Sequence, residues 1–381
     1  MIEINSILSQ PAYISFSSNS GGDAMILVTA FVVTALFSVI GLLGVVWMCR
    51  YFNIYDQPNA RKVHHCPVPR LGGVVFMPAA ILGVYTTLYL LGDTERRLEV
   101  GLSTLAMAAG ALIVYIIGIF DDLYGIKAVH KFIIQGISAL FLPLCGLLVT
   151  DLNGIMGLHE IPLWFSYPLT VLLIMTIVNA INLIDGIDGL ASGLSILILS
   201  AYAYVFAHHG HMLIAILNIA FVGALVAFFF FNVFGRTGKL KIFMGDVGSL
   251  FLGYVCAYMS IKSLMRPIAP VDCGEEQMLI SVTLLLIPVV DIMRVALQRL
   301  ATGHHIFEPD KTHIHHLFMS AGLSMHGALA AIILFFFVIC GMNYTLWSAH
   351  VNLTFILIVD VIVYALVVAI LLNRIKHTTQ G

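Results

Sequence analysis

The stretch that decides the fold is MILVTAFVVTALFSVIGLLGVVWM, residues 25–48, which contains no charged side chain. A bilayer core is about 30 Å thick, so roughly 20 apolar residues in a helix are enough to cross it. Ten further runs of this kind follow, at 71–92, 100–120, 132–150, 163–184, 190–207, 212–231, 247–265, 277–298, 326–346 and 351–373. We therefore predict an all-α polytopic membrane bundle of about eleven transmembrane helices, forming one integral membrane domain over residues 1–381.

The composition excludes an ordinary soluble domain. Of the 381 residues, 60% are hydrophobic and only 10% are charged, whereas soluble domains carry about 25% charged residues. The net charge of −2 provides no basic field, so we expect no nucleic-acid partner. The six cysteines are scattered without a CxxC motif, which argues against a disulfide framework.

The distribution of Lys and Arg predicts how the bundle is oriented. Most of the 18 Lys and Arg residues fall in alternate loops, on the side to which the first span leads. By the positive-inside rule, this side is cytosolic, the N-terminus lies outside and the C-terminus lies in the cytosol. We expect a multi-pass protein of the cytoplasmic (inner) membrane.

Polar residues gather in the five loops on this predicted cytosolic side, at 51–72, 121–131, 182–189, 232–249 and 299–325. Each loop combines ionisable residues with Gly or Pro. A single polar cytosolic loop is ordinary, but five such loops on one membrane face indicate a composite active site.

Two of these loops are rich in carboxylates and amides. Asp121 and Asp122 directly follow the apolar segment IVYIIGIF. Adjacent carboxylates repel each other, which favours a bridging divalent cation, although an exposed pair at a helix end is the simpler alternative. In NAINLIDGIDG, polar residues recur every third position, so neighbours share a helix face and could form an oxygen cage for Mg²⁺. These residues are Asn179, Asn182, Asp185 and Asp188. Helix capping would account for one or two of them.

A further carboxylate, Asp246 in FMGDVGS, lies where a predicted span begins. Such a residue is commonly a helix N-cap, and a helix N-terminus is also a site for metal-bound phosphate. Two charged residues fall within predicted spans. We expect Asp291 and Arg294 to pair, whereas Asp360 should face protein or water because a charge in lipid is costly; we assign Asp360 no role.

Basic and imidazole side chains accompany the carboxylates. Lys127 and Lys131 are spaced i, i+4, so they could neutralise phosphate or anchor the helix at lipid headgroups. Two further groups are Asn59, Arg61, Lys62, His64 and Arg70 in the first loop, and His313, His315 and His316 in the last. The histidines could bind zinc by composition, but no cysteine lies nearby. We favour imidazoles that bind diphosphate or move a proton.

With these motifs in place, the chain resembles the polyprenyl-phosphate N-acetylhexosamine-1-phosphate transferase family. It is most similar to the bacterial branch that uses undecaprenyl phosphate and N-acetylglucosamine. The resemblance extends from D-x-P-N-x-R-K-x-H, at Asp56 to His64, to H-I-H-H, at His313 to His316. It implies Mg²⁺-dependent transfer of a sugar-1-phosphate from a UDP-amino sugar to a polyprenyl phosphate in the membrane, with release of UMP.

The resemblance also implies roles for the residues. Asp121 and Asp122 would lie near the lipid phosphate and, with the three histidines, form the catalytic group. Asn182 and Asp246 would be the metal ligands, and Asp188 would lie towards the nucleotide base. The remaining polar residues named above would bind substrate: Asn59, Arg61, Lys62, His64, Arg70, Lys127, Lys131, Asn179 and Asp185.

Several alternatives stay open at this stage. The lipid phosphate could attack directly with help from Asp121 or Asp122, or the reaction could pass through a phosphorylated aspartate. The donor could be another UDP-amino sugar, and a second copy of the chain is a candidate partner. A cation-coupled transporter is the alternative of a different class, but it predicts ionisable groups at mid-membrane and on both sides.

Overall fold

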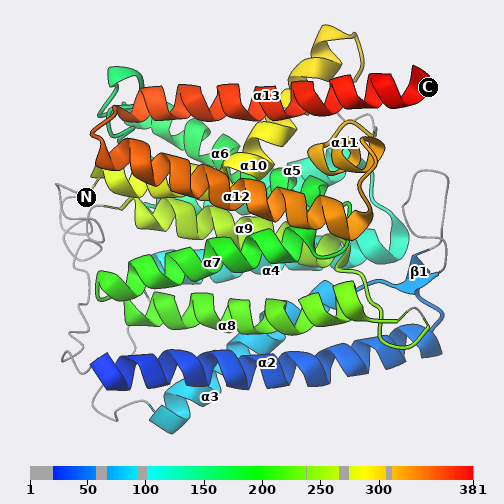
Figure 1. The fold of residues 1–381 in the computed structure, drawn as a ribbon. Coiled ribbons are helices and arrows are strands. Elements are labelled where there is room, and N and C mark those ends of the chain that lie inside the picture. Colours follow the sequence, from blue (N-terminus) through cyan, green and yellow to red (C-terminus); the bar gives the residue numbers. More distant parts are fainter. Residues whose placement is uncertain are drawn as a thin grey trace.

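The computed structural model describes residues 20–56, 67–91, 101–236, 238–265, 274–305 and 311–380. Long helices dominate this part of the chain, and many of them run side by side (Figure 1). In chain order they are α2 (Ser20–Tyr51), α3 (Phe76–Leu91), α4 (Leu102–Tyr124), α5 (Ala128–Leu144), α6 (Leu163–Ile184), α7 (Leu190–His208), α8 (Met212–Phe229), α9 (Gly245–Ser263), α10 (Gly274–Ala301), α11 (Ile314–Ser320), α12 (Met325–Ser348) and α13 (Leu353–Gln380).

Short elements connect some of these helices. Two short strands, β1 (Tyr55–Asp56) and β2 (Val68–Pro69), pair antiparallel beside the end of α2. Single helical turns of other types lie at η1 (Gly72–Val75), η2 (Ile155–Gly157) and η3 (Phe230–Phe234). The all-helical fold class is thus confirmed, and within the described residues an antiparallel pair of short strands is added to it.

The predicted spans are confirmed in large part. Nine helices in the described ranges are long and apolar enough to cross a membrane, and they coincide with nine of the eleven predicted runs. The other two runs are also helical. The 132–150 prediction is misplaced, because α5 begins at Ala128 and ends at Leu144. Helix α9 carries Asp246, Lys262 and several Gly and Ser residues, so its composition alone does not mark it as a span. The span count of eleven stays a prediction.

Helix α9 tolerates its polar composition because protein, rather than lipid, surrounds it. Sixteen of its nineteen residues are buried, and it packs against α4, α6 and α7. Glycines allow the backbones to approach closely. A Cβ on Gly118 of α4 would lie 2.4 Å from the Cα atom of Val247, and one on Gly253 would lie 2.6 Å from the Cα atom of Val178 in α6. These contacts hold α4 against the first turn of α9 and α6 against the middle of α9.

Asp360 and Arg294, which lie within helices, are each hydrogen-bonded to another side chain. Asp360 in α13 is fully buried, and its Oδ2 atom accepts a hydrogen bond of 2.9 Å from Asn343 of α12. The expectation that Asp360 faces protein is confirmed. Arg294 contacts the Oδ1 atom of Asp291 at 2.9 Å, so the predicted pair in α10 is also confirmed.

Candidate active site

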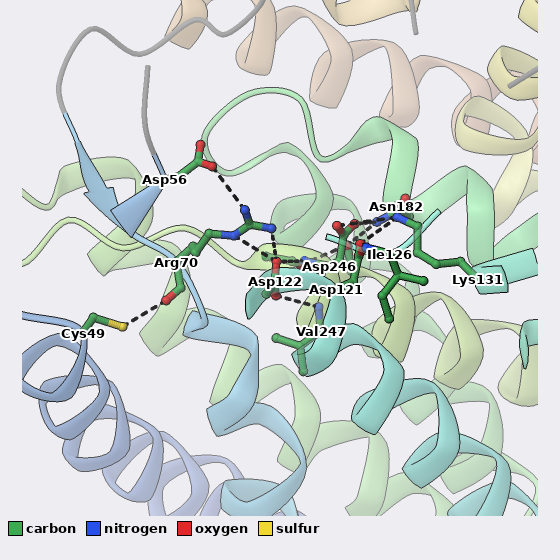
Figure 2. A network of polar contacts seen from close by, with 12 residues as sticks. Cys49, Asp56, Arg70, Asp121, Asp122, Ile126, Lys131, Asn182, Asp246 and Val247 are labelled. Carbon is green, nitrogen blue, oxygen red and sulfur yellow. Dashed lines mark hydrogen bonds and ion pairs between the residues drawn. The ribbon is translucent and has the colours of Figure 1, made fainter. Parts of the chain in front are cut away.

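An ion pair joins the first polar loop to the end of α4. The guanidinium of Arg70, directly after β2, donates to Asp122 through Nε at 3.0 Å and also through an Nη atom. The same guanidinium lies 3.4 Å from Asp56 of β1. Asp122 additionally accepts the backbone N–H groups of Asp246 and Val247 at 3.0 and 3.1 Å, as Figure 2 shows. Asp122 is therefore the N-terminal cap of α9, supplied by a different helix.

The neighbouring carboxylate, Asp121, belongs to a different group. We call Asp121, Lys131, Asn182 and Asp246 the acidic centre; they come from α4, α5, α6 and α9 (Figure 2). The Nζ atom of Lys131 lies 2.7 Å from Asp121 Oδ2 and 3.7 Å from Asp246 Oδ2. Asn182 donates to Asp246 Oδ1 at 2.6 Å. Two carboxylates thus share a single ammonium group.

The crowding of carboxylates disfavours their charged forms. Burial and the adjacent Asp121 raise the pKa of Asp246 well above its usual range. Burial, together with Asp246 and Asp188, raises the pKa of Asp185 at the end of α6 in the same way. A region in which carboxylates outnumber cations favours the binding of a further cation or a proton.

Two residues of the NAINLIDGIDG segment lie apart from the acidic centre. Asn179 donates 2.7 Å hydrogen bonds to Gln135 of α5 and to the Met175 carbonyl of its own helix. Asp188 is paired with Lys241. Only neighbouring residues were expected to share a face while the helix continues; three-residue steps drift around the helix and α6 ends at Ile184, so Asn179 and Asp188 meet different partners.

Asp188 is held by residues that the sequence did not indicate as site members. Besides Lys241, Asn232 of η3 donates to Asp188 at 3.4 Å and accepts the Gly189 N–H at 2.7 Å. Lys241 lies within the predicted 232–249 loop, so its region was identified. Its pairing with a residue 53 positions away leaves no local sequence signal.

The histidine segment is attached to the same end of the bundle by Asp291. We call Asp291, Arg294, His313 and Tyr364 the histidine anchor, in which the carboxylate of Asp291 accepts from the other three residues. The closest of these contacts is the 2.7 Å bond between Asp291 Oδ2 and His313 Nδ1. The sequence predicted the Asp291–Arg294 pair but neither its link to His313 nor the participation of Tyr364.

His315 lies deeper than its neighbours. It is 1% exposed, and neither ring nitrogen has a hydrogen-bond partner within the described ranges. A Cβ on Gly186 would lie 2.0 Å from its Nε2 atom, so only glycine permits this contact between the last loop and the turn after α6. Burial, with His316 and His313 nearby, lowers the pKa of His315 to about 3.

Other predicted site residues are less engaged. Lys127 is the N-cap residue of α5, and its carbonyl accepts the Lys131 N–H at 3.3 Å. Within the described ranges its side chain, unlike that of Lys131, makes no ion pair with Asp121 or Asp246. Asn59, Arg61, Lys62 and His64 lie outside the described residues. The alternative of a zinc site gains no support, because no group of three His, Cys, Asp or Glu side chains in the described ranges could hold a metal ion.

Together the fold and the site define a polytopic membrane protein with a composite polar site at one end of its bundle. Described parts of all five predicted loops meet there: Arg70 contacts Asp122, Asp122 contacts α9, Asn182 contacts Asp246, and Gly186 lies against His315. The roles of the individual side chains stay predictions.

Comparisons with known proteins agree with this class. The family model described as glycosyl transferase family 4 matches residues 104–264. A probable undecaprenyl-phosphate N-acetylglucosaminyl 1-phosphate transferase of Bacillus subtilis is 34% identical over 345 residues, covering 90% of this chain and 91% of that protein. Undecaprenyl-phosphate alpha-N-acetylglucosaminyl 1-phosphate transferases of Salmonella typhi and Escherichia coli K12 are each 27% identical, over 305 and 315 residues. These matches cover 78% of both chains for the Salmonella protein, and 81% of this chain and 79% of the other for the Escherichia protein.

The chain belongs to glycosyl transferase family 4, among its membrane-embedded sugar-1-phosphate transferases. It is therefore a multi-pass membrane enzyme, and the resemblance noted from its motifs is confirmed.

Proposed function

We propose that this enzyme transfers N-acetylglucosamine-1-phosphate from UDP-N-acetylglucosamine to undecaprenyl phosphate and releases UMP, with Mg²⁺ as cofactor. The reaction would take place at the cytosolic face of the inner membrane and start a cell-surface polysaccharide. The names of the relatives support the lipid acceptor and the transferred sugar. The observation that carries the proposal is the acidic centre, where four helices bring two carboxylates, an amide and an ammonium together.

The reaction depends more on stabilising negative charge than on removing a proton with a base. The second pKa of a phosphate monoester is near 6, so the lipid phosphate is mostly dianionic at neutral pH. Its oxygen would attack the sugar-proximal phosphorus of the donor, forming one P–O bond while the P–O bond to UMP breaks. Lys131 lies where its positive charge can offset the negative charge of the lipid phosphate and of the donor diphosphate as they meet.

The two adjacent aspartates would contribute differently. Both carboxylate oxygens of Asp122 are engaged by Arg70 and by the first turn of α9. Asp121 lies beside Lys131 in the acidic centre, so we assign any direct assistance of the lipid phosphate to Asp121. Asp122 would act by holding α9, and with it Asp246, in place.

The donor set of the acidic centre fits Mg²⁺. This ion is commonly bound by one or two carboxylates, with phosphates and water completing its coordination. Asp246 and Asp121 supply carboxylates, and the Asn182 amide oxygen makes no hydrogen bond to a described residue. When bound, Mg²⁺ would supply positive charge to the diphosphate. Asp246 and Asn182 are the residues we expect to hold it, as the resemblance to the family implies.

The proposal is tested by measuring UMP release by the purified chain with UDP-N-acetylglucosamine and undecaprenyl phosphate. We expect release that needs Mg²⁺ and stops with a chelator. Asp246→Ala should lower kcat by about 10²–10³-fold, the scale seen when one charge-stabilising group is removed. Glu276→Gln, at an exposed acid near the opposite end of α10, is the matched control and should stay within twofold.

Each other outcome has a defined meaning. Absence of UMP release with every UDP-amino sugar tested would contradict the proposed function, and ion flux without UMP release would favour the transporter. Release only with a different UDP-amino sugar would replace the donor. UMP release without any lipid acceptor would contradict direct attack and favour the phosphorylated aspartate.

A further inference from the structure

The carboxylate of Asp291 receives hydrogen bonds from three separate elements. Its Oδ1 atom accepts from Arg294 of α10 at 2.9 Å, from the Ile314 N–H of α11 at 3.0 Å and from the Tyr364 hydroxyl of α13 at 2.8 Å. Its Oδ2 atom accepts from the Nδ1 atom of His313 at 2.7 Å. Asp291 is 2% exposed, so this arrangement is enclosed by protein.

The two oxygen atoms are therefore not equivalent. Oδ1 faces three donors, whereas Oδ2 faces only the imidazole. An ionised carboxylate only accepts hydrogen bonds, so the Nδ1 atom of His313 must carry a proton. A neutral imidazole has a single N–H, which leaves Nε2 unprotonated. The protein thus determines which ring nitrogen of His313 is held and which is left to interact elsewhere.

The orientation of His313 is connected to the rest of the site. The rings of His313 and His315 are nearly parallel, at 6° with centroids 6.0 Å apart, and His315 contacts Gly186 in the turn after α6. Arg294 also donates to the Thr312 carbonyl at 2.5 Å, which fixes the backbone directly before His313. The anchor therefore holds both the ring and the chain that carries it.

We propose that Asp291 is a positioning residue for the transfer reaction. It holds His313 through Nδ1, so that Nε2 is the nitrogen available to exchange a proton or a hydrogen bond with the substrate. This inference rests on the proposed function and adds to it a residue of α10 outside the five loops. Tyr364 and Arg294 donate hydrogen bonds to the carboxylate, and within the described residues neither is hydrogen-bonded to the imidazole.

The variant Asp291→Asn tests this assignment and still places a hydrogen-bonding side chain of the same size in the histidine anchor. Three donors face the Oδ1 position, so the amide oxygen must occupy it and the NH₂ group must face His313. The Nδ1 atom then has to accept, and the ring proton moves to Nε2. All the hydrogen bonds of the anchor can still form, but the tautomer of His313 is inverted, as with an Asn beside a catalytic histidine in serine proteases.

Two measurements on the full-length protein in detergent or nanodiscs distinguish positioning from a structural role. With ¹⁵N-labelled histidine, NMR should show His313 protonated at Nδ1 in the wild type and at Nε2 in Asp291→Asn. In the transfer assay, kcat of Asp291→Asn should fall about 10²-fold, in the range of proton-transfer catalysis, with KM changed less than threefold. Tyr364→Phe, which removes one donor to the same carboxylate, should keep the wild-type tautomer and lose less than fivefold in kcat.

A double-mutant cycle with His313→Ala completes the test. Because Asp291 is proposed to act through the imidazole, adding Asp291→Asn to His313→Ala should reduce kcat less than threefold further. Losses that multiply, or an Asp291→Asn enzyme within twofold of the wild type, would overturn the proposal. If Asp291→Asn does not fold, Asp291→Glu, which keeps the charge but shifts the carboxylate, replaces it in the cycle with the same criterion.

The same experiments separate this inference from the proposed function. A wild-type protein that releases no UMP would contradict the function, whatever the tautomer. A wild-type protein that transfers the sugar phosphate but shows a multiplicative cycle would contradict only the role of Asp291. The NMR result does not depend on activity, so it tests the hydrogen-bond assignment in either case.

Discussion

The acidic centre and the histidine anchor lie at the same end of the bundle, but their carboxylates are neutralised to opposite degrees. In the anchor, one carboxylate accepts from a guanidinium, an imidazole, a hydroxyl and a backbone N–H group. In the acidic centre, Asp121 and Asp246 share the ammonium of Lys131. A carboxylate with a full set of donors is suited to hold structure, whereas two that share one cation are suited to bind another.

Asp122 shows that this difference does not follow from position in the sequence. It is adjacent to Asp121, yet its side chain is fully buried and, like that of Asp291, completely engaged. The two residues point to different partners because successive side chains on a helix are about 100° apart. We therefore expect substitutions at Asp122 to affect folding and substitutions at Asp121 to affect the reaction.

Removing the carboxylate of Asp122 should have the strongest effect on stability. Asp122→Ala should destabilise the protein by about 3–5 kcal/mol, the cost of leaving one partner of a buried ion pair alone. Asp121→Ala should cost less, because Lys131 keeps Asp246 as a partner and only one backbone N–H group, that of Ile126, loses its acceptor. Unfolding of the purified variants, followed by intrinsic fluorescence against denaturant or temperature, provides the comparison. Equal destabilisation by the two variants would show that the distinction between them is wrong.

A smaller effect concerns pH. The pKa of His315 is about 3 in the folded protein and near 6.5 in an unfolded chain. Below pH 6.5 the unfolded chain therefore binds a proton on His315 that the folded protein does not, so the contribution of His315 to stability falls as the pH decreases. At pH 5 this contribution should amount to a loss of about 2 kcal/mol. Asp246 and Asp185 act in the opposite direction, because their raised pKa values favour the folded protein at low pH. The His315 contribution should be absent in His315→Asn.

His326→Asn is the matched control for this pH effect, because its side chain is exposed and is not among the groups that lower the pKa of His315. The change in melting temperature between pH 7.5 and pH 5 should be the same in the wild type and in His326→Asn. In His315→Asn, the melting temperature at pH 5 should be higher, relative to that at pH 7.5, than in the other two proteins. The same change in all three proteins would contradict a buried, neutral His315.

The membrane fold could be predicted from the sequence because hydropathy is a local property. Nine predicted spans coincide with apolar helices. The meeting of the polar loops was predicted because alternate loops of a polytopic protein lie on the same side of the membrane. The start of α5 was missed, since its first turn contains His130 and Lys131, which a search for apolar runs excludes. Helix α5 nevertheless forms, because hydrogen bonding along the backbone does not require apolar side chains.

The partners of the site residues could not be predicted in the same way. Arg70 and Asp122 are 52 positions apart, and Asp291 and Tyr364 are 73 apart. Such pairs depend on how helices pack, which is determined by close contacts such as Gly118 against Val247. The sequence therefore identified which residues are polar and that their loops meet at one end of the bundle. It did not reveal that Asp122 caps α9 or that Asp291 holds His313.

We expect the acidic centre, and not the histidine anchor, to take up a divalent cation. This is tested by binding of Mn²⁺ to the purified protein, measured by electron paramagnetic resonance with UDP-N-acetylglucosamine present. Asp246→Asn should weaken Mn²⁺ binding by at least about tenfold, because it removes the charge of a proposed ligand and the loss of a group that merely supports a ligand already costs about that much. Asp291→Asn should leave binding within twofold. Unchanged binding in Asp246→Asn, or lost binding in Asp291→Asn, would show that the cation does not bind at the acidic centre.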